Sequence, residues 1–207
     1  MCARLSNIKK LIQWGADPNA TNKSGKTALL AFTEMYTSCL AELSIGIDRY
    51  AAVINLLLNS GANIDSQDNN GFTALMNMMQ KHVIFDERGG NQRSNIVLID
   101  ILLSYHPKIN LKDHQGNTAL MHALQQKHGS VVINKLLNSG AAVNIRNKNG
   151  QTPLYLALNN YSQHDPVITI IRSKTSNKYK RLTFAQNNPL HEIGYLFSQY
   201  LSKNNDI

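Results

Sequence analysis

The sequence of 207 residues is poor in cysteine, in acidic residues and in long apolar runs. Its two cysteines, Cys2 and Cys39, are too few for a disulfide framework or a cysteine metal site, which favours a reducing compartment inside a cell. No stretch approaches about 18 uninterrupted apolar residues, so we expect no membrane span. Residues 1–10 lack the apolar segment of a secretory signal peptide. These absences together predict an intracellular, cytoplasmic protein.

The shortage of acidic residues leaves the chain strongly basic. The 21 lysines and arginines exceed the 13 aspartates and glutamates, which gives a net charge of +8. Such a balance permits association with an acidic protein, an anionic lipid surface or nucleic acid, but it says nothing about the fold. Part of the excess is local, because five basic residues fall within 172–181.

What the sequence does contain is one motif that occurs four times. The copies read Gly-Lys-Thr-Ala-Leu at 25–29, Gly-Phe-Thr-Ala-Leu at 71–75, Gly-Asn-Thr-Ala-Leu at 116–120 and Gly-Gln-Thr-Pro-Leu at 150–154. Each copy follows a turn-like string, at 15–19, 61–65, 106–110 and 140–144. Internal repeats at this scale predict a stack of supersecondary units, which presents an extended binding surface instead of one deep pocket.

The spacing and the residues of these repeats resemble the ankyrin repeat family. The motif threonines are Thr27, Thr73, Thr118 and Thr152. They are 46, 45 and 34 residues apart, and the last spacing is close to the ankyrin period of about 33. Thr-Ala-Leu-Met-His-Ala at 118–123 and Thr-Pro-Leu-Tyr-Leu-Ala at 152–157 resemble the family signature. The resemblance covers about residues 5–175 and implies an all-α solenoid of helix-turn-helix pairs joined by β-hairpin-like turns.

The resemblance makes the whole chain, 1–207, one ankyrin-repeat domain. We expect four in-phase repeats at 21–66, 67–111, 112–145 and 146–175, between a partial N-terminal repeat at 1–20 and a degenerate C-terminal cap at 176–207. The first two full repeats are longer by 12 and 11 residues, and the surplus lies between their two helices. Residues 35–46 have helical periodicity, so the first helix is expected to be extended there. The polar, glycine-paired residues 85–93 predict a loop.

The repeated residues have physical roles that can be predicted. Each motif threonine is placed where its hydroxyl caps the first turn of a helix. Pro153 suits the first helical position, because proline lacks the amide that would be unsatisfied there. The glycines at 15, 61 and 140 are placed to end the second helices in left-handed geometry, and the motif leucines to enter the core between repeats.

One string comes close to a phosphate-binding loop. Residues 20–27 differ from Gly-x-x-x-x-Gly-Lys-Thr only by an alanine at the first position. A phosphate loop follows a buried strand, whereas this string follows a helix end and a turn. Because the glycine and the threonine recur in every repeat, only Lys26 is particular to this copy. We therefore expect no nucleotide binding.

The histidines and cysteines do not form an expected catalytic or metal set. His122 and His128 are six residues apart, off the spacing of two ligands on one helix. His191 and Glu192 lack the second histidine of a zinc-protease helix. Cys39 lies on an apolar helical stretch without an adjacent base to activate it. We expect no enzyme, no metal and no cofactor.

The resemblance implies a non-enzymatic module that binds another protein with an acidic or polar surface, and we expect a monomer. In this family, partners are held by the hairpin tips and by the exposed faces of the first helices. The matching residues are Lys23, Lys26, Asn69, Asn70, Phe72, His114, Gln115, Asn117, Lys148 and Gln151 at the tips, and Met35, Lys81 and Gln126 on the helices. Phe72 is expected to be exposed and to anchor the partner.

A second candidate surface is formed by the two insertions. They lie in adjacent repeats, so they should stand side by side, and Tyr36, Phe85 and Arg88 are the residues to test there. The family resemblance also marks asparagines of the turn-like strings as positions for hydroxylation. The matching residues are Asn19, Asn110 and Asn144, with Asp65 in the second turn.

Other functions stay open beside protein binding. Fold alone does not exclude a targeting module of a larger enzymatic or assembled system. The basic junction at 172–181, with aromatic residues nearby, is a candidate for binding nucleic acid or an anionic surface, although solvated charge is its ordinary explanation and a protein partner is expected instead. The composition resembles that of ankyrin proteins of host-associated bacteria, which implies an effector secreted into a host cell and docked onto a host protein.

Overall fold

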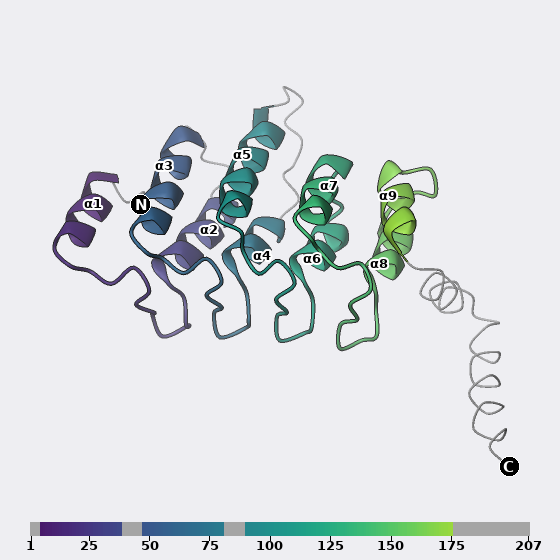
Figure 1. Ribbon diagram of the computed structural model, residues 1–207, viewed down its shortest axis with the longest axis horizontal. Helices are drawn as coiled ribbons and strands as arrows, with labels where there is room; N and C mark the ends of the chain where they lie inside the picture. The colour runs from purple at the N-terminus through teal and green to yellow at the C-terminus, as the bar shows by residue number, and fades with distance from the viewer. Residues whose placement is uncertain (1–4, 39–46, 81–89, 176–207) are drawn as a thin grey trace, which may run out of the picture.

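Nine helices, and no strand, are formed by the residues that the computed structural model describes, which are 5–38, 47–80 and 90–175. The helices are α1 (Leu5–Gln13), α2 (Ala28–Ser38), α3 (Ile47–Asn59), α4 (Ala74–Met79), α5 (Gly90–Ser104), α6 (Ala119–Gln125), α7 (Ser130–Asn138), α8 (Pro153–Asn160) and α9 (Pro166–Lys174). Figure 1 shows the helix pairs standing side by side in chain order, with the loops between pairs projecting together from one edge. The expected all-α class of stacked helix pairs is confirmed.

Neighbouring pairs pack with first helix against first helix and second helix against second helix. The first helices α2, α4, α6 and α8 contact one another in that order, and α3 contacts α5 while α7 contacts α9. The helix α1 packs on α3. The repeat boundaries, the partial first repeat at 1–20 and the cap at 176–207 stay predictions, and the residues of that cap lie outside the described ranges.

The short first helices are stabilised by the burial of their apolar side chains. The motif leucines Leu29, Leu75, Leu120 and Leu154 are all at most 3% exposed, so their predicted place in the core is confirmed. Every residue of α4, which has only six, is buried, and so are 119–124 of α6. Helices this short are not stable alone in water, so they depend on the helices stacked on either side.

The motif threonines cap the first helices as predicted. Their hydroxyl oxygens accept hydrogen bonds from the backbone amides of Leu30, Met76, Met121 and Tyr155 at 3.3, 3.2, 3.4 and 3.2 Å. Pro153 stands in the first turn of α8, where its missing amide costs nothing. A recurring Thr therefore starts each first helix at the same place relative to its hairpin.

The first two full repeats place part of their extra length in longer helices. In the first, α2 has 11 residues and α3 has 13, against 7 in α6 and 9 in α7. In the second, α5 has 15 residues although α4 has only 6. The rest of the two insertions, at 39–46 and 81–89, lies outside the described ranges. The hairpins keep one length throughout, as expected.

One interpretation of the insertions is wrong. Residues 90–93 belong to a helix and not to the predicted loop, because α5 begins at Gly90. Glycine costs about 1 kcal/mol in a helix interior, but this one is the first residue, and Asn, Gln and Arg after it are tolerated in helices. Residues 85–89 lie outside the described ranges, and so does 39–46 of the expected extension of α2, whose residues 35–38 are helical.

Candidate protein-interaction surface

Four hairpins form one edge of the molecule, which we call the hairpin row (residues 20–27, 66–73, 111–118 and 145–152) (Figure 1). Each hairpin has an asparagine or aspartate at its third position, namely Asn22, Asp68, Asp113 and Asn147. In each copy the side-chain Oδ1 accepts the backbone amides two and four residues further on, at 2.8 to 3.1 Å. Asn and Asp commonly fold a turn in this way. These four residues therefore set the shape of the hairpins.

Neighbouring hairpins are joined through their backbones. The amides of Asn69, His114 and Lys148 donate to the carbonyl oxygens of Ser24, Asn70 and Gln115 at 3.0, 2.9 and 2.9 Å. The contact is close at the motif glycines. A Cβ atom on Gly71 would lie 2.9 Å from the Cα of Asp113, and Gly71 also has φ +82°. Only glycine fits such an approach, so the four hairpins form a continuous row.

The turn-like strings are joined by their fifth residues. The side-chain Nδ2 of Asn19 donates to the carbonyl of Gly61 at 2.8 Å, and its Oδ1 accepts the backbone amide of Asn63 at 2.7 Å. Asn110 binds the turn-like string at 140–144 in the same way, at 3.0 and 2.8 Å, and Asp65 accepts the backbone amide of Lys108 at 2.8 Å. Three of the four expected hydroxylation positions thus stabilise contacts between repeats. Modification there, and at the exposed Asn144, stays a prediction.

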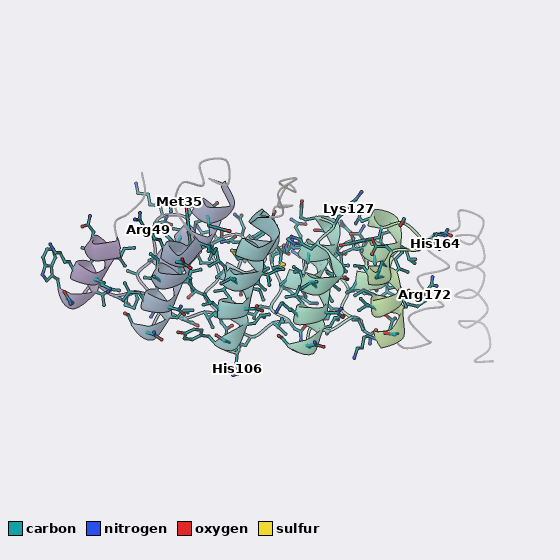
Figure 2. The ribbon with its side chains drawn as sticks, turned by 90° about the horizontal axis from the view of Figure 1, so that it is seen from above. Met35, Arg49, His106, Lys127, His164 and Arg172 are labelled. Carbon is teal, nitrogen blue, oxygen red and sulfur yellow. The ribbon has the colours of Figure 1, made fainter. Side chains whose placement is uncertain are left out.

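The predicted tip residues lie mostly in solvent. The exposed ones are Lys23, Asn69, Asn70, His114, Gln115 and Lys148. Lys26 and Gln151 are half-buried, and the Nζ of Lys26 forms an ion pair with Glu34 at 2.6 Å. Met35 and Gln126, on or beside the first helices, are also half-buried. Figure 2 places Met35 and Lys127, at the ends of α2 and α6, along the edge opposite His106.

Three residues expected on the surface are not exposed. Phe72 is half-buried, since its ring lies against that of His122 with 5.1 Å between centroids. Asn117 is 7% exposed, and its Oδ1 accepts the side-chain amide of Asn147 at 2.9 Å. Tyr36 is 2% exposed and packs edge-on against Tyr50, with 4.7 Å between ring centroids. Burial raises the pKa of Tyr36 to about 12. The expected exposure of Phe72 is wrong, and each of the three side chains contacts a neighbour that sequence spacing does not reveal. Contact of these residues with a partner stays a prediction.

Three further candidates, Lys81, Phe85 and Arg88, lie outside the described residues. The second surface, formed by the insertions, therefore stays a prediction, and buried Tyr36 does not contribute an exposed side chain to it.

A buried histidine connects the hairpin row to the first helices. The Nε2 of His122 lies 2.8 Å from the Oδ2 of Asp113, and its Nδ1 lies 3.1 Å from the Nε2 of Gln80. With the Gln80 amide donating to Nδ1, the proton stands on Nε2 and is donated to Asp113. Burial lowers the pKa of His122, although Asp113 acts in the opposite direction. The neutral form is favoured, which fits a structural role.

Two kinds of chemistry are disfavoured by the geometry. In the near-phosphate loop, Asn22 already binds the amides of Ser24 and Lys26, and the Lys26 ammonium is paired with Glu34. These are the groups that a phosphate would need. Within the described ranges, no three His, Cys, Asp or Glu side chains stand close enough to hold a metal ion. Cys39 lies outside those ranges.

The expectation of no membrane span can be compared with the length and polarity of the helices. Over the part of the chain that the structure describes, every helix is too short or too polar for a bilayer crossing.

Comparison with known proteins identifies the repeats. Residues 91–181 match the family model of ankyrin repeats in three copies, and no catalytic domain is found. Two curated relatives from Variola virus sources, both named ankyrin repeat protein OPG189, are 31% identical to this chain over 111 residues. The aligned part is 54% of this chain and 18% of each relative, so the chain spans less than a fifth of the length of these relatives. Over residues 91–181, the match, the stacked helix pairs and the repeated hairpins agree on ankyrin repeats.

Proposed function

We propose that this chain is a non-enzymatic module that binds another protein along its hairpin row. The observation that carries the proposal is that the backbone and the side chains of the row have different roles. The hairpin backbones are hydrogen-bonded to one another, while the six exposed tip side chains point into solvent. A surface that keeps its shape before binding loses little conformational entropy when a partner docks. An extended surface of this kind fits a folded or extended polypeptide better than a small molecule.

The test is a set of tip substitutions in the full chain. Asn70→Ala, Gln115→Ala and Asn149→Ala together remove three exposed side chains for which the described residues provide no side-chain hydrogen bond. The matched control carries Asn134→Ala, Asn138→Ala and Gln163→Ala, which are exposed on α7 and before α9. Both variants should keep the melting temperature of the parent, since exposed substitutions change stability by only about 0.5 kcal/mol.

The measurement is quantitative capture of partners from a lysate with the parent and both variants as bait. We expect proteins that bind the parent to be lost from the tip variant and kept by the control variant. Equal retention by both variants would exclude the hairpin row as the binding surface. Equal loss from both would point to a partner that covers the helix pairs as well.

A second candidate function is a targeting module within a larger system. The matched relatives favour it, because the aligned segment is only 18% of their length. Measured binding of the isolated chain to its captured partner tests this: affinity that appears only with further sequence attached supports the candidate. A secreted bacterial effector is a narrower form of the proposal that rests on composition alone, since the matched relatives are viral.

The basic junction is the third candidate, for nucleic acid or an anionic surface. Arg172 and Lys174 are exposed at the end of α9, and Figure 2 shows Arg172 at the C-terminal end of the stack; the junction residues beyond Thr175 lie outside the described ranges. Binding through phosphates falls steeply as salt is raised. A flat response of binding to salt would remove this candidate.

A further inference from the structure

We propose that the hairpin row binds an acidic polypeptide segment, whose carboxylates pair with Lys23, Lys112 and Lys148. The inference deepens the proposed function and rests on it. It names the chemistry of the partner, which neither the family match nor the fold provides.

The charges that the row exposes are of one sign. Its carboxylates are Asp68 and Asp113, which are 9% and 6% exposed, and both accept hairpin amides. Three lysines, by contrast, are exposed, one each in the first, third and fourth hairpins. None of the three has a carboxylate partner among the described residues, although the Nζ of Lys112 lies 3.4 Å from the carbonyl of Arg146. The field over the row is therefore positive.

The other two cations of the row are already bound within the molecule. Lys26 is paired with Glu34 at 2.6 Å, and the Nη1 of Arg146 donates to the carbonyl of Gly150 at 2.6 Å. A partner carboxylate would have to displace these contacts. The three exposed lysines are the cations that a partner meets first.

The central helices α3, α5 and α7 do not share this one-sided charge. Asp48 and Arg49 are both exposed on α3, and the Nζ of Lys135 on α7 forms an ion pair with Asp100 on α5 at 2.6 Å. Charges of opposite sign that stand together cancel at a distance, whereas like charges along one edge add. An acidic segment is thus directed to the hairpin row and not to α3, α5 or α7. The exposed lysines of α1 and α9, at the two ends of the stack, are the ones that the control variant below removes.

The polar tips fit a polypeptide. Asn70, Gln115 and Asn149 are exposed beside the lysines, one in each of the last three hairpins. Their amides can donate to and accept from peptide groups as well as side chains. A segment that reaches Lys23 and Lys148 has to cross all four hairpins, so the expected ligand is extended along the row.

Single-stranded nucleic acid is the competing anionic ligand, and the row lacks what it needs. Binding of nucleic acid relies on aromatic side chains that stack on bases and often on arginine. The one aromatic residue of the row is Phe72, which is half-buried against His122, and its one arginine is Arg146, which is already hydrogen-bonded. The observations therefore favour the acidic polypeptide.

The experiment compares two variants of the full chain that have the same net charge. The row variant carries Lys23→Gln, Lys112→Gln and Lys148→Gln. The control variant carries Lys9→Gln, Lys10→Gln and Lys174→Gln, which are exposed on α1 and α9. Fluorescence anisotropy measures binding of three probes: a labelled peptide in which Asp and Glu alternate with Ser and Gly, the same peptide with Lys in place of the acids, and single-stranded DNA with an equal number of negative charges.

We expect the parent to bind the acidic peptide, more weakly as salt is raised, and to ignore the lysine peptide. The row variant should bind about tenfold more weakly, as the loss of three exposed ion pairs implies, while the control variant stays within about twofold of the parent. Both variants should have the melting temperature of the parent. A loss of binding can then be attributed to the removed lysines and not to unfolding.

Three results would overturn the inference: no binding of the acidic peptide by the parent, equal weakening in both variants, or tighter binding of the DNA than of the peptide. The proposed function is tested separately by the capture experiment, so the two can fail independently. Loss of captured partners from the Asn70, Gln115 and Asn149 variant, with no binding of the acidic peptide, would mean that the row binds a protein through neutral polar contacts.

Discussion

The stack of helix pairs and the hairpin row repeat with the same period but are ordered by different interactions. In the stack, every residue of α4 and most of α6 are buried, so side-chain volume is constrained at each position. In the row, four Asn or Asp side chains and the hydrogen bonds between hairpins fix the backbone, and the tips stay in solvent. The same chain thus has one region that tolerates little change and one whose tips are open to change.

The difference teaches how such a fold separates stability from recognition. Substitutions at Lys23, Gln115 or Lys148 alter what the surface offers without removing a core contact. The two regions meet, among other places, where Asp113 of the row and His122 of α6 lie 2.8 Å apart. Substitutions on either side of that contact test how separate the regions are.

The largest effect is expected in the stack, from Leu120→Ala. Leu120 is fully buried in the middle of the stack, so its truncation leaves a cavity and should lower the free energy of unfolding by about 2–5 kcal/mol. The control is Gln115→Ala at an exposed tip, which should change it by less than about 0.5 kcal/mol. Urea denaturation followed by circular dichroism measures both. Similar losses in the two variants would contradict the contrast between stack and row.

A smaller effect is expected where the regions meet, from Asp113→Ala. This change removes the acceptor of two hairpin amides and the partner of His122, and should cost about 2–3 kcal/mol because buried donors are left unsatisfied.

The matched variant Asp113→Asn keeps the acceptor for the hairpin, as Asn22 and Asn147 do in their own hairpins, and should lose less than half as much. Hydrogen exchange of the Gln115 and Asn117 amides reports on the hairpin itself. Unchanged protection of both amides in Asp113→Ala would show that the hairpin does not depend on the aspartate.

Much of the stack could be predicted from the sequence because it obeys local rules. A threonine that recurs at one place predicts a cap, and a leucine two residues later predicts a core position; both are confirmed in all four copies. The residues that shape the row were missed, although a signal was present. An Asn or Asp stands five residues before every motif threonine, and such residues are typical of turns.

The exposure of single residues could not be predicted, since it depends on contacts between repeats. Phe72 is at a tip position, yet its ring packs against His122, 50 residues further on. Lys26 and Lys112 look alike in the sequence, but only the first has a carboxylate within reach. Which lysines are available to a partner becomes visible only in the folded structure, because the pair of Lys26 with Glu34 forms when the hairpin packs beside α2. The partner contacts themselves stay predictions.

The smallest expected effect is a change in pH dependence, from His122→Gln. Burial holds the pKa of His122 below its ordinary value, so between that folded value and about pH 6.5 the unfolded chain binds a proton that the folded chain does not. The free energy of unfolding therefore falls as the pH drops below about 6.5. His122→Gln removes this contribution and should flatten the decline, whereas the control Gln163→Ala, at an exposed site without a titratable group, should leave it unchanged. Urea denaturation between pH 7 and pH 5 measures the slopes. An unchanged slope in His122→Gln would mean that this histidine takes up its proton in the folded protein, as an ion pair with Asp113, and that the row and the stack are coupled by charge.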